Sequence, residues 1–290
     1  RSAPVVTARG DALDLRGAVR GYPLTLRGAA SYAAPNDWRF DDLALDSEGN
    51  TARIAGTLDA TALMLEATVD VADAGLLWPG LGGSLRGGVA LTGTWAAPRA
   101  SGRLTGRDLT LAGASAAVVT LDGEAGLAPD TALRLNLDAS NVVRGSVEIE
   151  RARLVLDGTT AAHDASVDIS GRGWRGNGVG RGGLANGTAW RGTLANLELA
   201  EDVLGGTWLL DEPRMLTFGR SGITLATSCL RHTSGALWCS EVDINGRPED
   251  RLVVSGQKFE LATLRPLLPP ALTLEGTYQL SASLFDVTGD

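Results

Sequence analysis

The chain has 290 residues, a formal net charge of −8 and a mean hydropathy of +0.04, so it is long enough to bury a large core. The acidic balance argues against nucleic acid and against an anionic membrane surface as the main partner, because both require clustered positive charge. Glycine is depleted inside helices and strands, so 38 glycines beside 5% aromatic residues indicate many turns between many short elements.

Alternation of apolar and polar residues dominates the chain and predicts half-buried β-strands. In the segment 63–71, Leu63, Leu65, Val69 and Val71 share one parity and polar residues occupy most of the other. The same alternation recurs at 133–138, 147–157, 194–199, 252–254 and 272–280. Turn signals at intervals of roughly 8–13 residues favour a meander of about 20 to 26 strands over βαβ units, which need a helix between strands.

Many of these predicted strands end on an apolar residue, a variable residue and a glycine. This triplet occurs at 15–17, 26–28, 54–56, 85–87, 91–93, 104–106, 121–123, 156–158, 169–171, 254–256 and 274–276. Its recurrence predicts a repeat architecture that grows by one strand at a time.

Two segments depart from the alternation and resemble each other. Residues 73–87 and 261–276 each read as a short helix stopped by proline, followed by a new strand. We therefore expect short helices near 73–80 and 261–268 that punctuate a single elongated segment spanning 1–290 of a larger protein. Two domain boundaries at these places are the alternative.

The two cysteines offer the most suggestive chemistry. Cys229, His232 and Cys239, with Glu241 and Asp243 beyond them, could be zinc ligands, but zinc sites usually have paired ligand spacing on both sides and here there is one close pair. A Cys229–Cys239 disulfide across a strand pair, with its turn near 233–235, is favoured. It would place the chain in an oxidising compartment.

Other constellations give weak support for an enzyme. Gly171, Gly173 and Gly176 spell a dinucleotide-binding fingerprint, yet the glycines that follow prevent the helix that this motif requires. Both histidines, His163 and His232, lie in polar stretches without a nucleophile elbow. The carboxylate pairs 41–42 and 201–202 fall where solvated strand faces or turns are expected. We expect no catalytic residue, cofactor or metal, and an enzymatic β-solenoid ranks third among the functional alternatives.

The segment 93–109, from Gly93-Thr94-Trp95 to Leu109, resembles the TamB family of the AsmA-like, bridge-like lipid-transfer superfamily. The resemblance continues through the cysteine pair and the stretch 267–276. It implies an elongated antiparallel sheet curled into a half-pipe, the β-taco, with an apolar interior. It further implies an inner-membrane anchor and contact with a TamA-like outer-membrane barrel, both through regions outside this segment.

The resemblance and the alternation together lead us to expect a periplasmic groove for phospholipid acyl chains between the inner and outer membranes of a Gram-negative bacterium. The alternative is a scaffold that assembles outer-membrane or autotransporter proteins through its strand edges. The residues expected to line the groove are Leu63, Leu65, Val69, Val71, Leu109, Leu111, Leu133, Leu135, Leu137, Val147, Ile149, Leu154, Leu156, Leu252, Val254, Leu272 and Leu274.

Overall fold

The computed structural model describes residues 7–19, 21–33, 37–76, 79–185, 189–202, 205–219, 222–245, 250–261 and 275–285. Over these ranges the regular structure consists of nineteen β-strands, assigned to one sheet, and a single turn of 3-10 helix. The predicted all-β, repetitive antiparallel fold is confirmed. The chain divides into two compact units, Arg1–Arg153 and Leu154–Asp290, with the boundary inside one strand. The units are described one at a time, and a single continuous segment stays a prediction.

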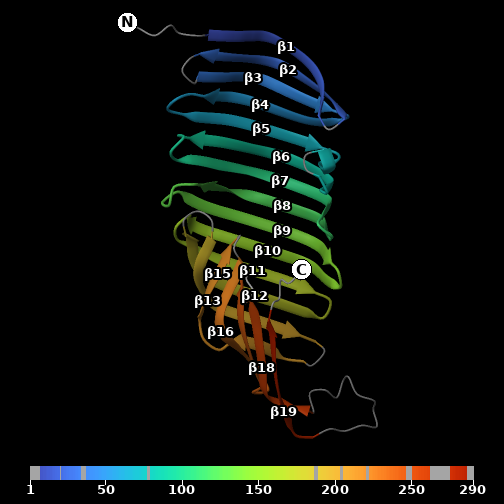
Figure 1. Ribbon diagram of the computed structural model, residues 1–290, viewed down its shortest axis with the longest axis vertical. Helices are drawn as coiled ribbons and strands as arrows, with labels where there is room; N and C mark the ends of the chain where they lie inside the picture. The colour runs from blue at the N-terminus through green and yellow to red at the C-terminus, as the bar shows by residue number, and fades with distance from the viewer. Residues whose placement is uncertain are drawn as a thin grey trace. The chain divides into compact units, whose positions relative to one another are not determined.

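Unit 1 is an antiparallel meander in which each strand pairs with the next along the chain, as the blue-to-green part of Figure 1 shows. Its strands are β1 (Thr7–Val19), β2 (Tyr22–Ala33), β3 (Asp37–Ser47), β4 (Asn50–Leu58), β5 (Leu63–Val71), β6 (Gly82–Gly93), β7 (Pro98–Leu111), β8 (Ala114–Gly126) and β9 (Ala132–Arg144), followed by the first half of β10 (Val147–Thr159).

Unit 2 continues the antiparallel pattern with one exception. Its long third strand, β13, pairs with β15 along its first half and with β14 along its second, and both of these pair with β16. The strands are β11 (His163–Gly171), β12 (Trp174–Ala185), β13 (Ala189–Glu201), β14 (Thr207–Leu210), β15 (Arg214–Gly219), β16 (Gly222–His232), β17 (Leu237–Ile244), β18 (Arg251–Glu260) and β19 (Thr277–Phe285).

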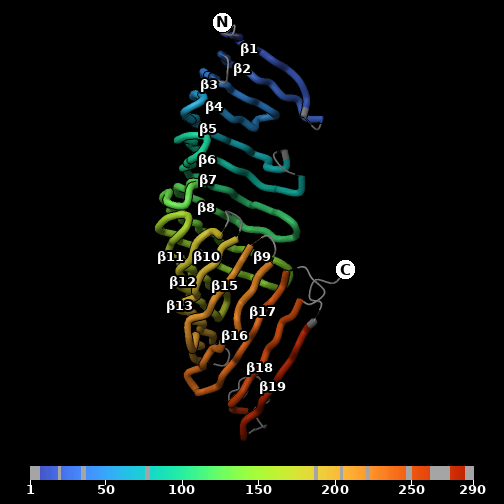
Figure 2. Tube along the Cα trace, turned by 60° about the vertical axis from the view of Figure 1, so that its left-hand side comes forward, coloured from blue at the N-terminus to red at the C-terminus, as the bar shows by residue number. Residues whose placement is uncertain are grey.

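Several glycine triplets lie inside strands, which corrects the sequence prediction at those places, whereas Gly93 and Gly171 do end β6 and β11. Gly28, Gly56, Gly87 and Gly123 lie inside β2, β4, β6 and β8, and the strands are therefore longer and fewer than expected. A Cβ added at Gly56 would lie 2.0 Å from the Met64 carbonyl oxygen. Glycine is required because the neighbouring backbone comes this close. The tube view shows that the strands of unit 1 are curved along their length (Figure 2).

Positive-φ residues inside strands shift the side-chain alternation. Asp108 has φ 51°, and a Cβ placed on Gly106 would lie 2.4 Å from Leu109 Cδ1. The left-handed conformation of Asp108 thus returns Leu109 to the face on which Gly106 lies. Lys258 has φ 57° between Gly256 and Phe259 and produces the same arrangement in β18.

The helix predicted near 73–80 is one 3-10 turn, Ala74–Leu76. Its backbone is held from both sides, because the Gly75 N–H donates to Asp73 Oδ1 at 2.9 Å and the Asp73 N–H donates to Asn50 Oδ1 at 3.0 Å. Residues 77–78 lie outside the described ranges, and 79–80 form a turn. Of the helix predicted near 261–268, Leu261 alone falls inside the described part of the chain, in a 3-10 conformation.

Candidate functional site

One face of the unit 1 sheet is built from continuous apolar rows. Residues directly opposite each other in antiparallel strands share a face, so the strand register defines these rows. One row crosses all nine strands through Leu15, Leu26, Leu45, Ala52, Val69, Gly87, Leu104, Leu121 and Leu137. A second crosses seven strands through Leu43, Ile54, Ala67, Val89, Gly102, Gly123 and Leu135. Neither row contains a polar side chain.

The opposite face of unit 1 is charged and pairs its charges across neighbouring strands. Arg86 contacts Asp70 at 2.7 Å and Arg103 contacts Asp122 at 2.7 Å. These pairs are more than 40% exposed, so each contributes little to stability. Their value is to keep one face in water while the other stays apolar. The acids Asp41 and Asp42 belong to the same pattern, since they pair separately with Arg39 and Arg53.

Within unit 1, no second layer of described residues covers the apolar face. Over the ranges that the structure describes, the buried hydrophobic residues are six: Leu63, Val71, Ala74, Leu133, Ala236 and Phe259. Members of the apolar rows remain accessible, among them Leu15 at 56%, Ile54 at 38% and Val89 at 38%. A chain of this length with a packed core would bury far more apolar side chains. The rows therefore form an accessible surface.

A shallow hollow of about 180 Å³ lies on this face over β6 to β9. Gly102 and Gly123 form its floor, opposite each other in β7 and β8, and Leu104, Leu121 and Leu135 stand around it. Because two adjacent positions of the second row carry no side chain, the surrounding leucines leave a shallow apolar space between them that could hold part of an alkyl chain.

The predicted lining residues of β5, β9 and β18 each share one face within their strand. Val69, Leu135 and Leu137 belong to the two apolar rows of unit 1. Leu63, Leu65 and Val71 share the face of Val69 in β5, and Leu133 shares the face of Leu135 in β9. Leu252 lies opposite both Val242 and Leu284, and Val254 lies opposite Ser240 and Ala282. Ile149, Leu154 and Leu156 are half-buried in β10. Their contact with a ligand stays a prediction.

Other predicted lining residues are less enclosed. Leu111 is 51% exposed and Val147 is 56% exposed, because each stands at the end of its strand beside a turn. Leu109 faces the apolar side through the left-handed Asp108. Leu272 and Leu274 fall outside the described residues.

In unit 2 the glycine-rich segment is a strand, and the apolar face runs over it. Gly171, at the end of β11, and Trp174, at the start of β12, pair across a two-residue turn, and Gly176, Gly178 and Gly180 follow within β12. Gly178 lies between Val167 of β11 and Leu197 of β13, and its missing Cβ would lie 3.7 Å from Leu197 Cδ1. The fingerprint thus lies in a hairpin, where no helix offers amides to a phosphate.

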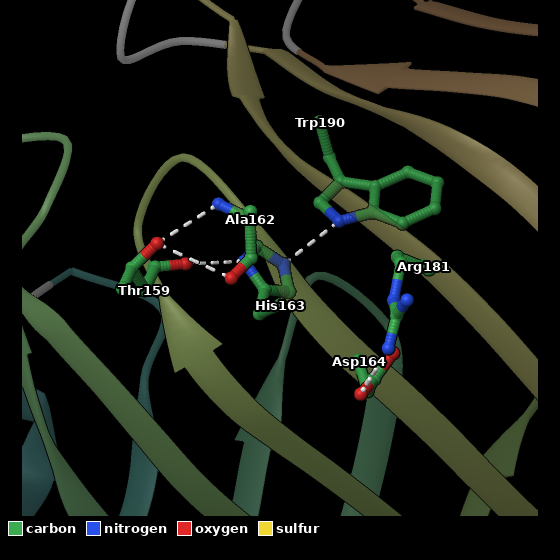
Figure 3. Close-up of polar contacts among 6 residues, drawn as sticks. All are labelled: Thr159, Ala162, His163, Asp164, Arg181 and Trp190. Carbon is green, nitrogen blue, oxygen red and sulfur yellow. Dashed lines mark hydrogen bonds and ion pairs between the residues drawn. The ribbon is translucent and has the colours of Figure 1, made fainter.

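Near one end of this face a buried histidine is fixed by a tryptophan (Figure 3). His163 is 3% exposed, its Nε2 accepts from the Trp190 indole N–H at 2.8 Å, and its Nδ1 donates to the Thr159 carbonyl at 2.9 Å. The two bonds assign the proton to Nδ1. Trp190 also lies over Gly192, whose added Cβ would be 2.4 Å from Trp190 Cη2. Both ring nitrogens of His163 are thus used in local hydrogen bonds, and the pair has a structural role.

The neighbouring residue illustrates the charged face of unit 2. Asp164 and Arg181 form a two-bond ion pair at 2.7 and 3.0 Å across β11 and β12 (Figure 3). The hydrogen bond from Arg181 lowers the pKa of the Asp164 carboxyl below its ordinary value of 3.8 and raises that of Arg181.

An aromatic cluster occupies the same face farther along unit 2. Phe259, 7% exposed, lies with its ring centre 5.7 Å from that of Trp208 and 5.1 Å from that of Tyr278. The ring centre of Trp208 lies 4.7 Å from that of His232, with the two rings tilted by 47°. The His232 ring nitrogens contact Ser234 Oγ at 2.7 Å and the Gly205 carbonyl at 3.1 Å, so both are engaged in local structure.

The cysteines form a disulfide on the charged side of the sheet. Cys229 of β16 lies directly opposite Cys239 of β17, with Cα atoms 4.0 Å apart and the turn at 233–235 between the strands. The next pair in register, Leu230 and Trp238, faces the other way. The disulfide therefore leaves the apolar face unobstructed. Among the residues that the structure describes, no cluster of three or more His, Cys, Asp or Glu side chains is arranged to hold a metal.

Arg214, a charged residue on the apolar face, was missed from the sequence. Arg214 begins β15 directly opposite Leu194 of β13, which in turn lies opposite Gly180. The alternation Arg214, Leu216, Phe218 was a readable signal, but the short strands β14 and β15 around it are hard to place without their partners.

The family was established by comparison with known proteins. None of the helical structure described here is long and apolar enough to cross a membrane. No solved structure matches the chain. The family model described as TamB, N-terminal domain, matches residues 7–285, which is nearly the whole chain. We conclude that the chain belongs to the TamB N-terminal domain family.

Proposed function

We propose that the apolar face binds the acyl chains of phospholipids and serves as a periplasmic conduit between the inner and outer membranes. The family is an envelope-associated transport and assembly component, which agrees with a role at membranes. The observation that carries the proposal is the set of uninterrupted apolar rows on an uncovered face of the sheet.

The energetics favour a mobile hydrocarbon ligand. Each methylene that leaves water for an apolar surface contributes about 0.8 kcal/mol, so an acyl chain gains several kcal/mol from a face of this kind. In the first row, the positions from Leu104 through Leu121 to Leu137 repeat the same side chain on successive strands. Neighbouring sites are therefore close to equivalent, and a chain can move between them without a large change in binding free energy.

The proposed setting places the partners of the groove outside the described sheet. A TamA-like barrel in the outer membrane and an anchor in the inner membrane would engage other regions of the protein. The disulfide supports an oxidising compartment such as the periplasm, because disulfides persist there and are rare in the cytosol. No residue of the groove needs to be catalytic for this role.

Two adjacent residues with opposite orientation provide the test. Val69 lies in the apolar row between Ala52 and Gly87, whereas Thr68 faces the charged side beside Arg53. We expect Val69→Glu to remove most of the co-purifying phospholipid, because covering a charged carboxylate with an acyl chain costs the hydration of that carboxylate. Lipid mass spectrometry of the purified chain measures the lipid content. Thr68→Glu adds the same charge to the same strand and should leave the lipid content unchanged.

A second readout covers the case in which Val69→Glu does not fold. A photo-crosslinking amino acid at Leu121 should capture phospholipid, and the same probe at Thr120, on the other face, should not. Equal lipid content in both glutamate variants, or crosslinking at both positions alike, would refute the conduit.

The alternative role, assembly of outer-membrane proteins, would use backbone groups at strand edges in place of the apolar face. If the conduit is correct, Val69→Glu should impair lipid traffic in cells carrying the full-length protein and should leave autotransporter assembly intact. The reverse result, impaired assembly with normal lipid traffic, would favour the scaffold.

A further inference from the structure

Arg214 is an arginine on the predominantly apolar face of unit 2. In the register of unit 2 it continues the row Ala165, Gly180, Leu194 across β11, β12 and β13. The next residues on its own face, Leu216 and Phe218, lie opposite Gly192 and Trp190. Among the paired residues that the structure describes on this face of unit 2, Arg214 is the single arginine, because the others, such as Arg181 and Arg231, lie on the charged side.

The hydrogen-bonding capacity of Arg214 is only partly used. Its Nη2 contacts Glu212 Oε2 at 3.0 Å, and Glu212 is 66% exposed at the turn before β15. The Nε atom is buried and has no hydrogen-bond partner, while the side chain as a whole is 30% exposed. A guanidinium has five N–H donors and cannot lose its charge, and the geometry of its donors matches carboxylate and phosphate oxygens.

The apolar groups beside Arg214 are suited to contact the alkyl tail of an amphiphile. Leu194 stands beside it with its Cδ1 3.9 Å from the position that a Cβ on Gly178 would take, and Leu197 flanks the same glycine at 3.7 Å. These leucines and the side-chain-free glycines present hydrocarbon within reach of the guanidinium. A ligand with an anionic head and an alkyl tail would satisfy both features at once.

We propose that Arg214 binds the oxyanion headgroup, a phosphate or carboxylate, of an amphiphile whose alkyl chain lies on the apolar face of unit 2. This rests on the proposed lipid function and adds selectivity to it: unit 2 prefers anionic to zwitterionic lipids. The preference arises because the positive choline group of a zwitterion is repelled by the cation. Of the acids described on this face, Glu212 already pairs with Arg214, and Glu201 lies opposite Trp174 at the far end of β13 from Leu194.

The test compares three probes with the same alkyl chain, titrated into the 290-residue chain below their micelle concentrations by calorimetry. These are dodecyl phosphate, dodecylphosphocholine and dodecyl maltoside. We expect dodecyl phosphate to bind about tenfold more tightly than dodecylphosphocholine, the gain of one charge-assisted contact. In Arg214→Gln the two affinities should agree within about twofold, and Arg214→Lys should keep most of the preference.

Arg231→Gln is the matched control. Arg231 also stands on a strand of unit 2, but it pairs with Asp211 on the charged side, so its loss should leave all three affinities unchanged. If Arg214→Gln fails to fold, the same contact is read in the unsubstituted chain, where the preference for dodecyl phosphate should fall as salt rises.

Each outcome has a defined meaning. If none of the three probes binds, the lipid groove itself is refuted, and this inference falls with it. If all three bind equally and Arg214→Gln changes nothing, the groove stands and the headgroup site is overturned. Inorganic phosphate that binds as tightly as dodecyl phosphate would also overturn it, because the alkyl chain would then contribute nothing.

Discussion

His163 and Trp190 form a buried hydrogen bond on the apolar face of unit 2. The indole N–H is the hydrogen-bond donor to Nε2 of a histidine that is almost fully buried, and the ring covers two glycines at 182 and 192. A buried acceptor that loses its donor pays its desolvation without compensation. The pair therefore stabilises the end of the face as a unit.

We predict that Trp190→Phe lowers the free energy of unfolding by about 1–2 kcal/mol, since the aromatic ring stays but the donor is lost. Urea denaturation of the purified chain measures this as a lower midpoint. Trp95→Phe removes the same kind of donor, from Nε1 to the Asp59 carbonyl at 2.8 Å, at a position that is 60% exposed. Water replaces that partner, so an equal cost in both variants would contradict the explanation.

The Asp164 and Arg181 pair predicts a pH dependence whose sign follows from the lowered pKa of Asp164. A depressed carboxyl pKa stabilises the fold above the ordinary value of 3.8 and stops doing so as the pH falls through the lowered value. Asp164→Asn should thus be less stable than the unsubstituted chain at about pH 7 and equally stable at about pH 2. Because the pair is exposed, the difference is small. Urea midpoints that differ by the same amount at both pH values would be inconsistent with it.

At the scale of the strand, glycine placement sets where the sheet can bend. A Cβ on Gly123 would lie 2.2 Å from the Arg134 carbonyl oxygen of β9, and one on Gly102 would lie 2.3 Å from the Gly88 carbonyl oxygen of β6. Side chains at these positions would force neighbouring strands apart and fill the hollow over β6 to β9.

We expect Gly123→Ala to destabilise the chain by about 1–3 kcal/mol through this overlap. Gly17→Ala is the control, because Gly17 lies in β1 with no atom within 4 Å of its added Cβ. It should be neutral or slightly stabilising, since alanine loses less backbone entropy than glycine. Thermal unfolding followed by circular dichroism measures both, and equal shifts would show that glycine content rather than close approach matters.

At the scale of the molecule, most contacts join strands that are one or two positions apart in the chain. β8 contacts β7 and β9, whereas β13 contacts β12, β14 and β15. Stability in such an arrangement is approximately a sum of local terms.

Gly123 lies in β8 and Trp190 in β13, two strands that do not pair with each other, so the effects of Gly123→Ala and Trp190→Phe on the free energy of unfolding should add within about 0.5 kcal/mol in the double variant. A larger coupling, measured by urea denaturation of the single and double variants, would show that the two units respond as one cooperative block.

The sequence alone determined the all-β class and the two-faced character of the sheet. Both depend on a period of two residues, which is a property of the extended backbone and is readable at Leu63, Leu65 and Val69 without knowledge of any partner strand. It also paired Cys229 with Cys239, because a sequence separation of 10 suits a short hairpin.

Tertiary structure alone decided where strands end and which side chains stay on the apolar face. The glycine triplets seemed to be strand ends, yet Gly56 and Gly123 lie within strands because a neighbouring backbone approaches them. The side chain of Leu109 is reoriented by the left-handed Asp108, and Arg214 lies on the apolar face because the pairing of β15 with β13 places it opposite Leu194. Each of these depends on contacts between strands, and a local pattern of residues does not contain them.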